Sequence, residues 1–433
     1  MFSFLNNSMS TATQRFLTFE LGKGDTNGLK KVFAVALNIH ICIALLVIVL
    51  AETVGLWFVN AKLVIPADRM VAANWIYQFA ILSFCVNVLQ VPYNATLIAH
   101  EKMSIYAYIS ILEVLLKLGI VYLLVISPID KLITYGFLFL MVQILIRAIY
   151  QVYCRRHYEE TKFHLFWDKG LYKQMSGFAG WNLFGSIAWL LRDQGLNIVL
   201  NLFFGPVINA ARGVSYQVSN AVVNFISNFQ VALNPQITKN YANGSYGEME
   251  KLAYQGIKFS FLLLFMMAFP LCIDIKFVLS IWLVKVPDYT ALFIILILID
   301  ALVGNLFGTP FMTSLSATGK IRNYQITVSC IILLIVPVSY VILKLGAGPE
   351  SVFYVAILFN LISGMARYAF CIKQIGYSAK RYVSYVILPL TGVVIVSLPI
   401  PLITKYYLEN QLSGLLEFLS LCVISFAFAF VAS

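Results

Sequence analysis

Apolar runs of about 20 residues, separated by short polar stretches, make up almost the whole chain. A run of this length is enough for an α-helix to cross the hydrocarbon core of a bilayer. Membrane strands are not expected, because the alternation of apolar and polar residues that a barrel needs is absent. The pattern predicts twelve spans, at about 32–58, 72–99, 104–126, 132–154, 176–203, 206–234, 253–283, 289–315, 322–344, 351–373, 383–404 and 413–433.

Composition agrees with an all-α polytopic membrane protein, since hydrophobic residues are 61% of the chain and charged residues 11%. The net charge of +11 does not indicate a nucleic-acid partner, because the basic residues lie in short loops between the apolar runs. Eighteen of them fall in one set of alternate loops and six in the opposite set. The richer set is expected to be cytoplasmic.

Two stretches, 92–102 and 310–320, repeat the same order of residue types: proline, aromatic, small hydroxyl, leucine, alanine and lysine. Each stretch ends one apolar run and precedes the next, and both are predicted to face the same side of the membrane. The chain is therefore expected to contain two parallel, pseudo-repeated helical lobes, an architecture used mostly by transporters.

The repeat predicts the domain limits. We expect an amino-terminal lobe at 1–154, a cytoplasmic linker at 155–175, a carboxyl-terminal lobe at 176–376 and two additional helices at 377–433. Residues 4–31 resemble the region near 226–253, so the first lobe is expected to have four full spans and to lack two at its start. A chain with both lobes complete would have about fourteen spans.

Charged residues within spans are functional candidates, because a charge in hydrocarbon is costly. Arg147 and Arg367 are 220 residues apart, each about two turns from the cytoplasmic end of the last span of its lobe. They are candidates for a pseudo-symmetric pair of guanidiniums that binds phosphate in bidentate fashion. The alternative is that both only extend to cytoplasmic lipid headgroups.

A second group of charges interrupts the central spans. Arg192 and Asp193 are adjacent, so they point to different sides of a helix and are not expected to neutralise each other. One of them should face a polar cavity or a partner on another helix. Arg212, in the next span, is a candidate for the same cavity. Asp300 has no local partner and is either a proton or cation site or the counter-ion of a deep arginine.

Other polar positions are less specific. Glu113 and Lys117 have the i, i+4 spacing of a salt bridge on one helical face, so they are expected to neutralise each other. The sixth span is rich in Asn, Gln and Ser, which predicts either a helix that lines a watery cavity or one that packs centrally. No nucleotide-binding or hydrolase motif occurs, and the four histidines are too scattered for a metal site, so neither an enzyme nor a cofactor is expected.

Several short motifs are specific enough to compare with known families: RDQGLN at 192–197, FGP at 204–206, NAARG at 209–213, NPQI at 234–237, VPYN at 91–94 and AHEK at 99–102. In these motifs the chain resembles the polysaccharide-flippase branch of the MOP exporter superfamily, the O-antigen or Wzx-like translocases. This branch is related to MATE-type exporters.

The resemblance implies two helical lobes around a central cavity, with two further helices at the carboxyl end. It implies alternating-access transport of an undecaprenyl-diphosphate-linked oligosaccharide across the bacterial inner membrane, for surface polysaccharide such as lipopolysaccharide O-antigen. Partners would be the lipid-linked oligosaccharide, membrane lipids and polysaccharide polymerase or assembly proteins. The substrate-binding candidates are then Arg147, Arg367, Arg192, Arg212 and Lys117. The coupling or counter-ion candidates are Asp300, Asp193 and Glu113.

Two other functions remain open from the sequence. A cation-coupled multidrug exporter of the MATE type would have the same fold, but its acidic residues would control the cavity. A membrane glycan polymerase or ligase would need a large outer loop with catalytic residues, and no predicted loop is long enough.

Overall fold

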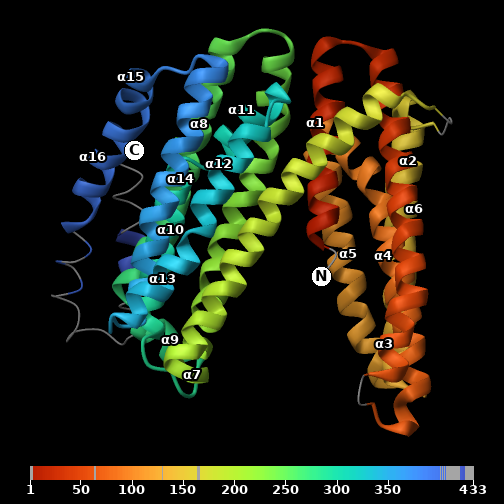
Figure 1. Ribbon diagram of the computed structural model, residues 1–433, viewed down its shortest axis with the longest axis horizontal. Helices are drawn as coiled ribbons and strands as arrows, with labels where there is room; N and C mark the ends of the chain where they lie inside the picture. The colour runs from red at the N-terminus through yellow and green to blue at the C-terminus, as the bar shows by residue number, and fades with distance from the viewer. Residues whose placement is uncertain are drawn as a thin grey trace. The chain divides into compact units, whose positions relative to one another are not determined.

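The computed structural model describes residues 3–62, 65–128, 130–162, 166–399, 401, 403, 405 and 420–424. All regular secondary structure among these residues is helical, as the hydrophobic pattern predicted (Figure 1). The chain forms two compact units, residues 1–180 and 181–433, called unit 1 and unit 2.

In unit 1 the helix α4 (Met70–Ala99) packs against all the other long helices. These neighbours are α1 (Ser3–Lys23), α2 (Thr26–Leu50), α5 (Met103–Ile126) and α6 (Lys131–His157). Tyr93 of α4 is fully buried, and its ring meets the edge of Phe33 from α2 at 5.4 Å. Shorter elements complete the unit: the π-helical turn η1 (Ala51–Gly55), α3 (Leu56–Ala61) and the 3-10 turns η2 (Ala67–Arg69) and η3 (Glu159–Thr161).

In unit 2 the helix α14 (Ser351–Ile375) has the most neighbours. It packs against α10 (Thr290–Leu306), α11 (Thr309–Thr318), α12 (Arg322–Leu333) and α13 (Ile335–Lys344). The remaining helices of unit 2 are α8 (Tyr246–Ile273), α9 (Ile275–Trp282), α15 (Ala379–Tyr382), the π-helical η4 (Val383–Ile387) and α16 (Leu388–Ser397). Buried Leu264, Leu279 and Ile294 join α8, α9 and α10 in one apolar cluster.

The helix α7 (Lys169–Ala242) is in fact two helices that meet at a sharp break. Gly205 has φ 76° and ψ −170°, a backbone region open essentially to glycine alone. Pro206 follows and has no N–H to donate, so the helical hydrogen bonding cannot continue through this point. The two segments correspond to the predicted spans 176–203 and 206–234.

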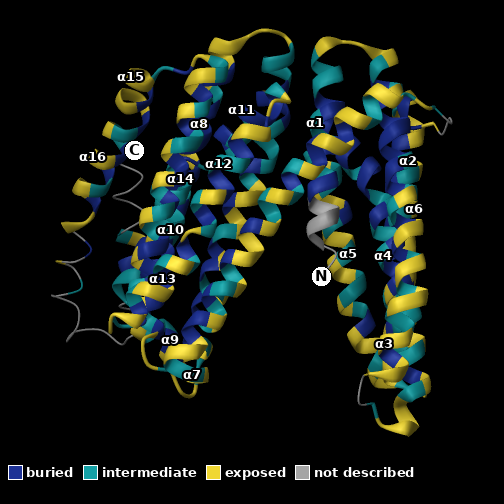
Figure 2. Cartoon of the chain, in the orientation of Figure 1, coloured by how far each residue is buried: buried dark blue, intermediate teal, exposed yellow. Residues whose placement is uncertain are grey.

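Among the described residues, ten helical segments are long and apolar enough to cross a membrane by length and composition. One of these segments, α7, contains two predicted spans. Large apolar side chains on their outer faces are exposed, among them Ile111, Leu115 and Val125 of α5 (Figure 2). Such faces are stable against lipid rather than water. The chain is therefore a multi-pass membrane protein. The twelfth predicted span, 413–433, lies mostly outside the described residues.

Units 1 and 2 contain the same contact at equivalent positions of the predicted repeat. Cys154 of α6 donates its S–H to the Tyr93 carbonyl at 3.5 Å, and Cys371 of α14 donates to the Phe311 carbonyl at 3.7 Å. Tyr93 and Phe311 are the aromatic residues of the two repeated stretches. The turns that follow α1 and α7 also match, since each contains a glycine of positive φ, Gly24 and Gly244. Thus α1 corresponds to the final part of α7.

The two units divide at residues 180 and 181, inside α7, so residues 155–175 belong to unit 1. The linker role of residues 155–175 stays a prediction. The η3 turn packs against α2, and helix formation begins again at Lys169.

We predict that Gly205→Ala destabilises the protein by about 1–3 kcal/mol, because a residue with a Cβ is strained at the φ and ψ of this position. A clash is not the reason, since no atom lies within 4 Å of the added Cβ. Gly177→Ala is the matched control, since Gly177 is helical in α7 and its Cβ also meets nothing within 4 Å. The control should raise stability by up to about 1 kcal/mol. Thermal unfolding in detergent measures both, and equal effects of the two substitutions would contradict the proposed backbone constraint.

Candidate functional site

Two ion pairs occupy the middle of unit 2. Arg192 of α7 is buried, and its Nη2 lies 3.4 Å from Oδ2 of Asp300 on α10. The other carboxylate oxygen of Asp300 accepts a hydrogen bond of 2.5 Å from the Asn360 amide on α14. Arg192 also lies over the Trp189 ring, 4.8 Å from its centroid. Asp300 is thus the ion-pair partner of a deep arginine, and its role as a proton or cation site stays a prediction.

The second pair joins the two segments of α7. Arg212 Nη2 contacts Oδ1 of Asp193 at 2.5 Å and the Asp193 carbonyl at 3.2 Å, and Nη1 contacts Asn197 Oδ1 at 3.3 Å. Residues 193 and 212 would lie roughly 28 Å apart along a straight helix. Their contact therefore shows that the segments before and after Gly205 run back along each other (Figure 1).

These pairs agree with the prediction that Arg192 and Asp193 do not neutralise each other. Each has a partner on a different segment, so four charges from three helical segments form two ion pairs. The Asp193 side chain remains 43% exposed, whereas that of Arg192 is 5% exposed. Asp193 is consequently the most exposed side chain of this charged group.

The segment of α7 that follows Arg212 has an exposed polar stripe. It consists of Gln217, Asn220, Asn224, Ser227 and Asn228, all exposed and spaced to lie on one side of the helix. Ser215, Ser219 and Gln230, on the other side, are buried. Amide and hydroxyl groups are unfavourable against acyl chains, so this side of the helix requires water or a polar solute. The sequence predicted a polar span but not which of its polar residues are exposed.

Arg367 and Arg147 are not at equivalent positions of the repeat. The cysteine contacts place Cys154 opposite Cys371, an offset of 217 residues, whereas the arginines are 220 apart. They are thus three residues, nearly one helical turn, out of register. A shift of nearly one turn leaves the two residues on corresponding faces of α6 and α14, and the pseudo-symmetric phosphate-binding pair stays a prediction.

The two arginines also differ in their contacts. Arg367 Nη1 donates to the Phe307 carbonyl at 2.5 Å, where α10 ends and α11 begins. Arg147 makes no hydrogen bond or ion pair with the residues that the structure describes, and its Nε is buried without a partner. Neither arginine has a carboxylate partner among the described side chains.

Lys117 and Glu113 of α5 contact each other at 2.6 Å. The two side chains are 40% and 26% exposed, so they form the local i, i+4 pair that their spacing predicted.

Two features escaped the sequence analysis because they depend on tertiary contacts. In unit 1 a cavity of about 1090 Å³ lies between α2, α4 and α6, lined mainly by apolar residues such as Val54, Phe79 and Phe139. In unit 2 Glu250 of α8 is buried and bound by Arg381 at 2.9 Å. Within the described part of the chain, no three His, Cys, Asp or Glu residues gather closely enough to hold a metal ion.

Known structures share this architecture. No protein-family model matches the chain, and no curated protein is significantly similar to it. A point mutant of a MATE protein is similar with a TM-score of 0.77 at 11% identity, covering 86% of this chain and 84% of the other. An outward-facing multidrug resistance MATE transporter of the MOP superfamily has a TM-score of 0.73 at 12% sequence identity, with the same coverage of the two chains.

A MOP superfamily transporter from Pyrococcus furiosus, reported to have a binding pocket of reverse polarity, gives a TM-score of 0.73 at 10% identity. The structural match covers 86% of this chain and 84% of that transporter. The chain therefore has the fold of MATE and MOP transporters. At sequence identities this low, the structural similarity establishes the fold only. The substrate has to be argued from the residues of this chain.

We predict that Asp300→Ala lowers the free energy of unfolding by about 3–5 kcal/mol, because it leaves the buried Arg192 charge without its counter-ion. Adding Arg192→Met to Asp300→Ala should recover most of this loss, since the uncompensated charge is then removed. Thermal unfolding of both variants in detergent gives the comparison.

The control is Lys30→Gln, which breaks the exposed pair of Lys30 and Glu159 and should cost no more than about 1 kcal/mol. The single variant Arg192→Met completes the comparison. If its loss and that of Asp300→Ala simply add in the double variant, Arg192 and Asp300 are not energetically coupled and the expectation fails.

Proposed function

We propose that this protein is a transporter of the bacterial inner membrane that moves an undecaprenyl-diphosphate-linked oligosaccharide from the inner to the outer leaflet. Its fold is that of MATE and MOP transporters, which supports transport as the activity. The substrate class is argued from the charged residues inside the spans. The lipid-linked oligosaccharide would pass to a polysaccharide polymerase or assembly protein.

The balance of deep charges carries the proposal. The acidic residues Asp193 and Asp300 are each bound by an arginine, which reduces their attraction for a cationic solute. Arg147 and Arg367, by contrast, have no carboxylate partner among the described residues. A diphosphate supplies the missing negative charge, and a guanidinium binds phosphate oxygens with two parallel hydrogen bonds.

The exposed polar stripe of α7 supports a carbohydrate as the rest of the solute. Its amide and hydroxyl groups can exchange hydrogen bonds with sugar hydroxyls as the glycan crosses. The polyprenyl chain needs no polar path, because it remains in the hydrocarbon of the bilayer. Alternating access of the two lobes would then expose the stripe first to the cytoplasm and then to the opposite side.

A cation-coupled multidrug exporter is the second candidate. The large apolar cavity of unit 1 favours it, since apolar cavities of this kind suit lipophilic compounds. A multidrug resistance MATE transporter also has the same fold. On this alternative, activity depends on the acidic residues, Asp300 above all, and is insensitive to loss of Arg147.

We predict that Arg147→Ala reduces transport at least about tenfold, because the loss of one charge-assisted hydrogen bond costs about 1.5–3 kcal/mol. The measurement is restoration of surface polysaccharide in a bacterial strain that lacks its own flippase, normalised to the amount of protein in the membrane. Arg367→Ala should also reduce transport, with some loss of protein because the Phe307 carbonyl loses its donor.

Arg156→Ala is the matched control, since Arg156 lies nine residues further along α6, is exposed and carries the same charge. It should transport as the unmodified protein does. If Arg147→Ala and Arg156→Ala both restore polysaccharide fully, the role of Arg147 in binding diphosphate is refuted. Drug resistance that is lost in Asp300→Asn but kept in Arg147→Ala would favour the multidrug exporter instead.

A further inference from the structure

A separate pocket of about 460 Å³ lies between α8 and the segment formed by α15 and η4. It is independent of the ion pairs described above and of the substrate proposed for transport. Its polar lining consists of Glu250, Lys251, Gln255, Lys258 and Arg381. The residues that carry positive charge therefore outnumber the single carboxylate.

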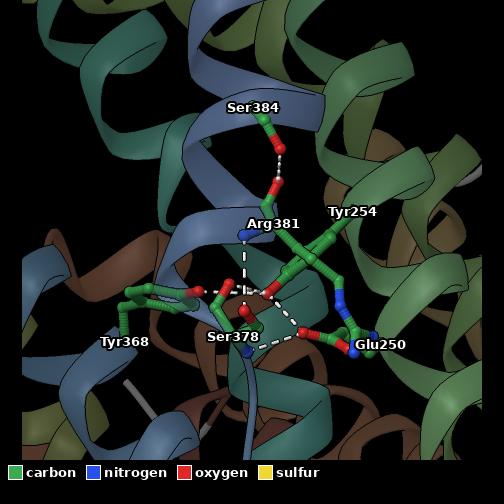
Figure 3. A network of polar contacts seen from close by, with 6 residues as sticks. All are labelled: Glu250, Tyr254, Tyr368, Ser378, Arg381 and Ser384. Atoms are coloured by element: carbon green, nitrogen blue, oxygen red, sulfur yellow. Dashed lines mark hydrogen bonds and ion pairs between the residues drawn. The ribbon is translucent and has the colours of Figure 1, made fainter.

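The wall of this pocket is fixed by a network around Glu250 (Figure 3). One oxygen of the buried carboxylate accepts hydrogen bonds from the Tyr254 hydroxyl at 2.8 Å and the Ser378 backbone N–H at 2.7 Å. The other oxygen accepts from Arg381 Nη1 at 2.9 Å. The Tyr254 hydroxyl also contacts that of Tyr368 at 3.0 Å. The segment that carries Arg381 is thus attached to α8, and the pocket is built before any ligand enters.

The network provides hydrogen-bond donors for both carboxylate oxygens of Glu250, and the positive charges of the pocket outnumber its one negative charge. Arg381 uses one Nη for Glu250, while its side chain is 63% exposed, so other N–H groups remain available. Lys251 and Lys258 lie two turns apart on the same face of α8 as Gln255. Neither lysine forms an ion pair with any side chain that the structure describes. The pocket consequently offers positive charge and hydrogen-bond donors to an anion.

The opposite rim of the pocket is apolar. Phe259 of α8 and Tyr385 of η4 line it, and they are 55% and 68% exposed. Both lie within segments long and apolar enough to span a membrane, so their exposed rings face hydrocarbon. The charge pattern of the loops predicts that the beginning of α8 is at the cytoplasmic surface. Phe259 directly follows Lys258, and Tyr385 lies about one turn after Arg381, so each ring borders a cation. Cations beside exposed aromatic rings match the phosphate of a phospholipid and the acyl chain next to it.

We propose that this pocket binds the phosphate-bearing headgroup of an anionic phospholipid of the cytoplasmic leaflet, such as a phosphatidylglycerol. The phosphate contacts Lys251, Lys258 and the free N–H groups of Arg381, and an acyl chain lies along Phe259 and Tyr385. Basic pockets between membrane helices at the cytoplasmic side are suited to such headgroups. The bound lipid stabilises the contact between α8 and the helices that follow Ser378.

The test is the affinity of the purified full chain in detergent for phosphatidylglycerol and for phosphatidylcholine with the same acyl chains, measured by native mass spectrometry. Phosphatidylglycerol should bind more tightly. Removing one lysine charge, in Lys251→Gln or Lys258→Gln, should weaken its binding about fivefold, and the double variant should weaken it further. Binding of phosphatidylcholine should not change.

Lys380→Gln is the matched control, because Lys380 is exposed beside Arg381 but does not line the pocket. It should bind phosphatidylglycerol as the unmodified protein does. Equal affinity for the two lipids, or equal effects of Lys380→Gln and the double variant, would overturn the proposal. Complete displacement of phosphatidylglycerol by excess inorganic phosphate would also overturn it, because the site would then recognise a free anion rather than a lipid.

Discussion

A charged side chain in the hydrocarbon region is stable only when an opposite charge or several hydrogen bonds meet it, and the interior of unit 2 is arranged around this requirement. Arg192 meets Asp300 and Arg212 meets Asp193, so each pair connects segments that are distant in sequence. The first pair holds α7 to α10, with Asn360 adding α14 to the same contact. The second holds the two segments of α7 together.

The second pair depends in turn on one backbone position. Gly205 permits a conformation that other residues resist, and Pro206 prevents helical hydrogen bonding from continuing across it. The chain therefore reverses direction at the end of one span and returns as the next. Only this reversal brings Arg212 to Asp193. The polar stripe then follows on the returning segment, one side exposed and the other buried in unit 2.

The two copies of the repeat share one contact and differ at another position. Both units keep the contact of a buried cysteine with a backbone carbonyl, which fixes the packing of α6 on α4 and of α14 on α11. They differ at the proline of the repeated stretch. Pro92 lies within the continuous helix α4, whereas Pro310 begins α11 after a break that follows Phe307. Arg367 donates to the carbonyl freed by that break, so its charge also has a structural use that Arg147 does not share.

The sequence by itself determined the all-helical membrane class, the positions of most spans and the existence of the repeat, because these follow from the length of apolar runs and from local residue order. It also predicted the Glu113–Lys117 pair, whose members are one turn apart. Only the tertiary structure decided that Asp300 is the partner of Arg192, that Arg147 and Arg367 are out of register, and that Glu250 anchors the final helices. These contacts join residues more than a hundred positions apart or depend on helical rotation, and neither is encoded in local periodicity.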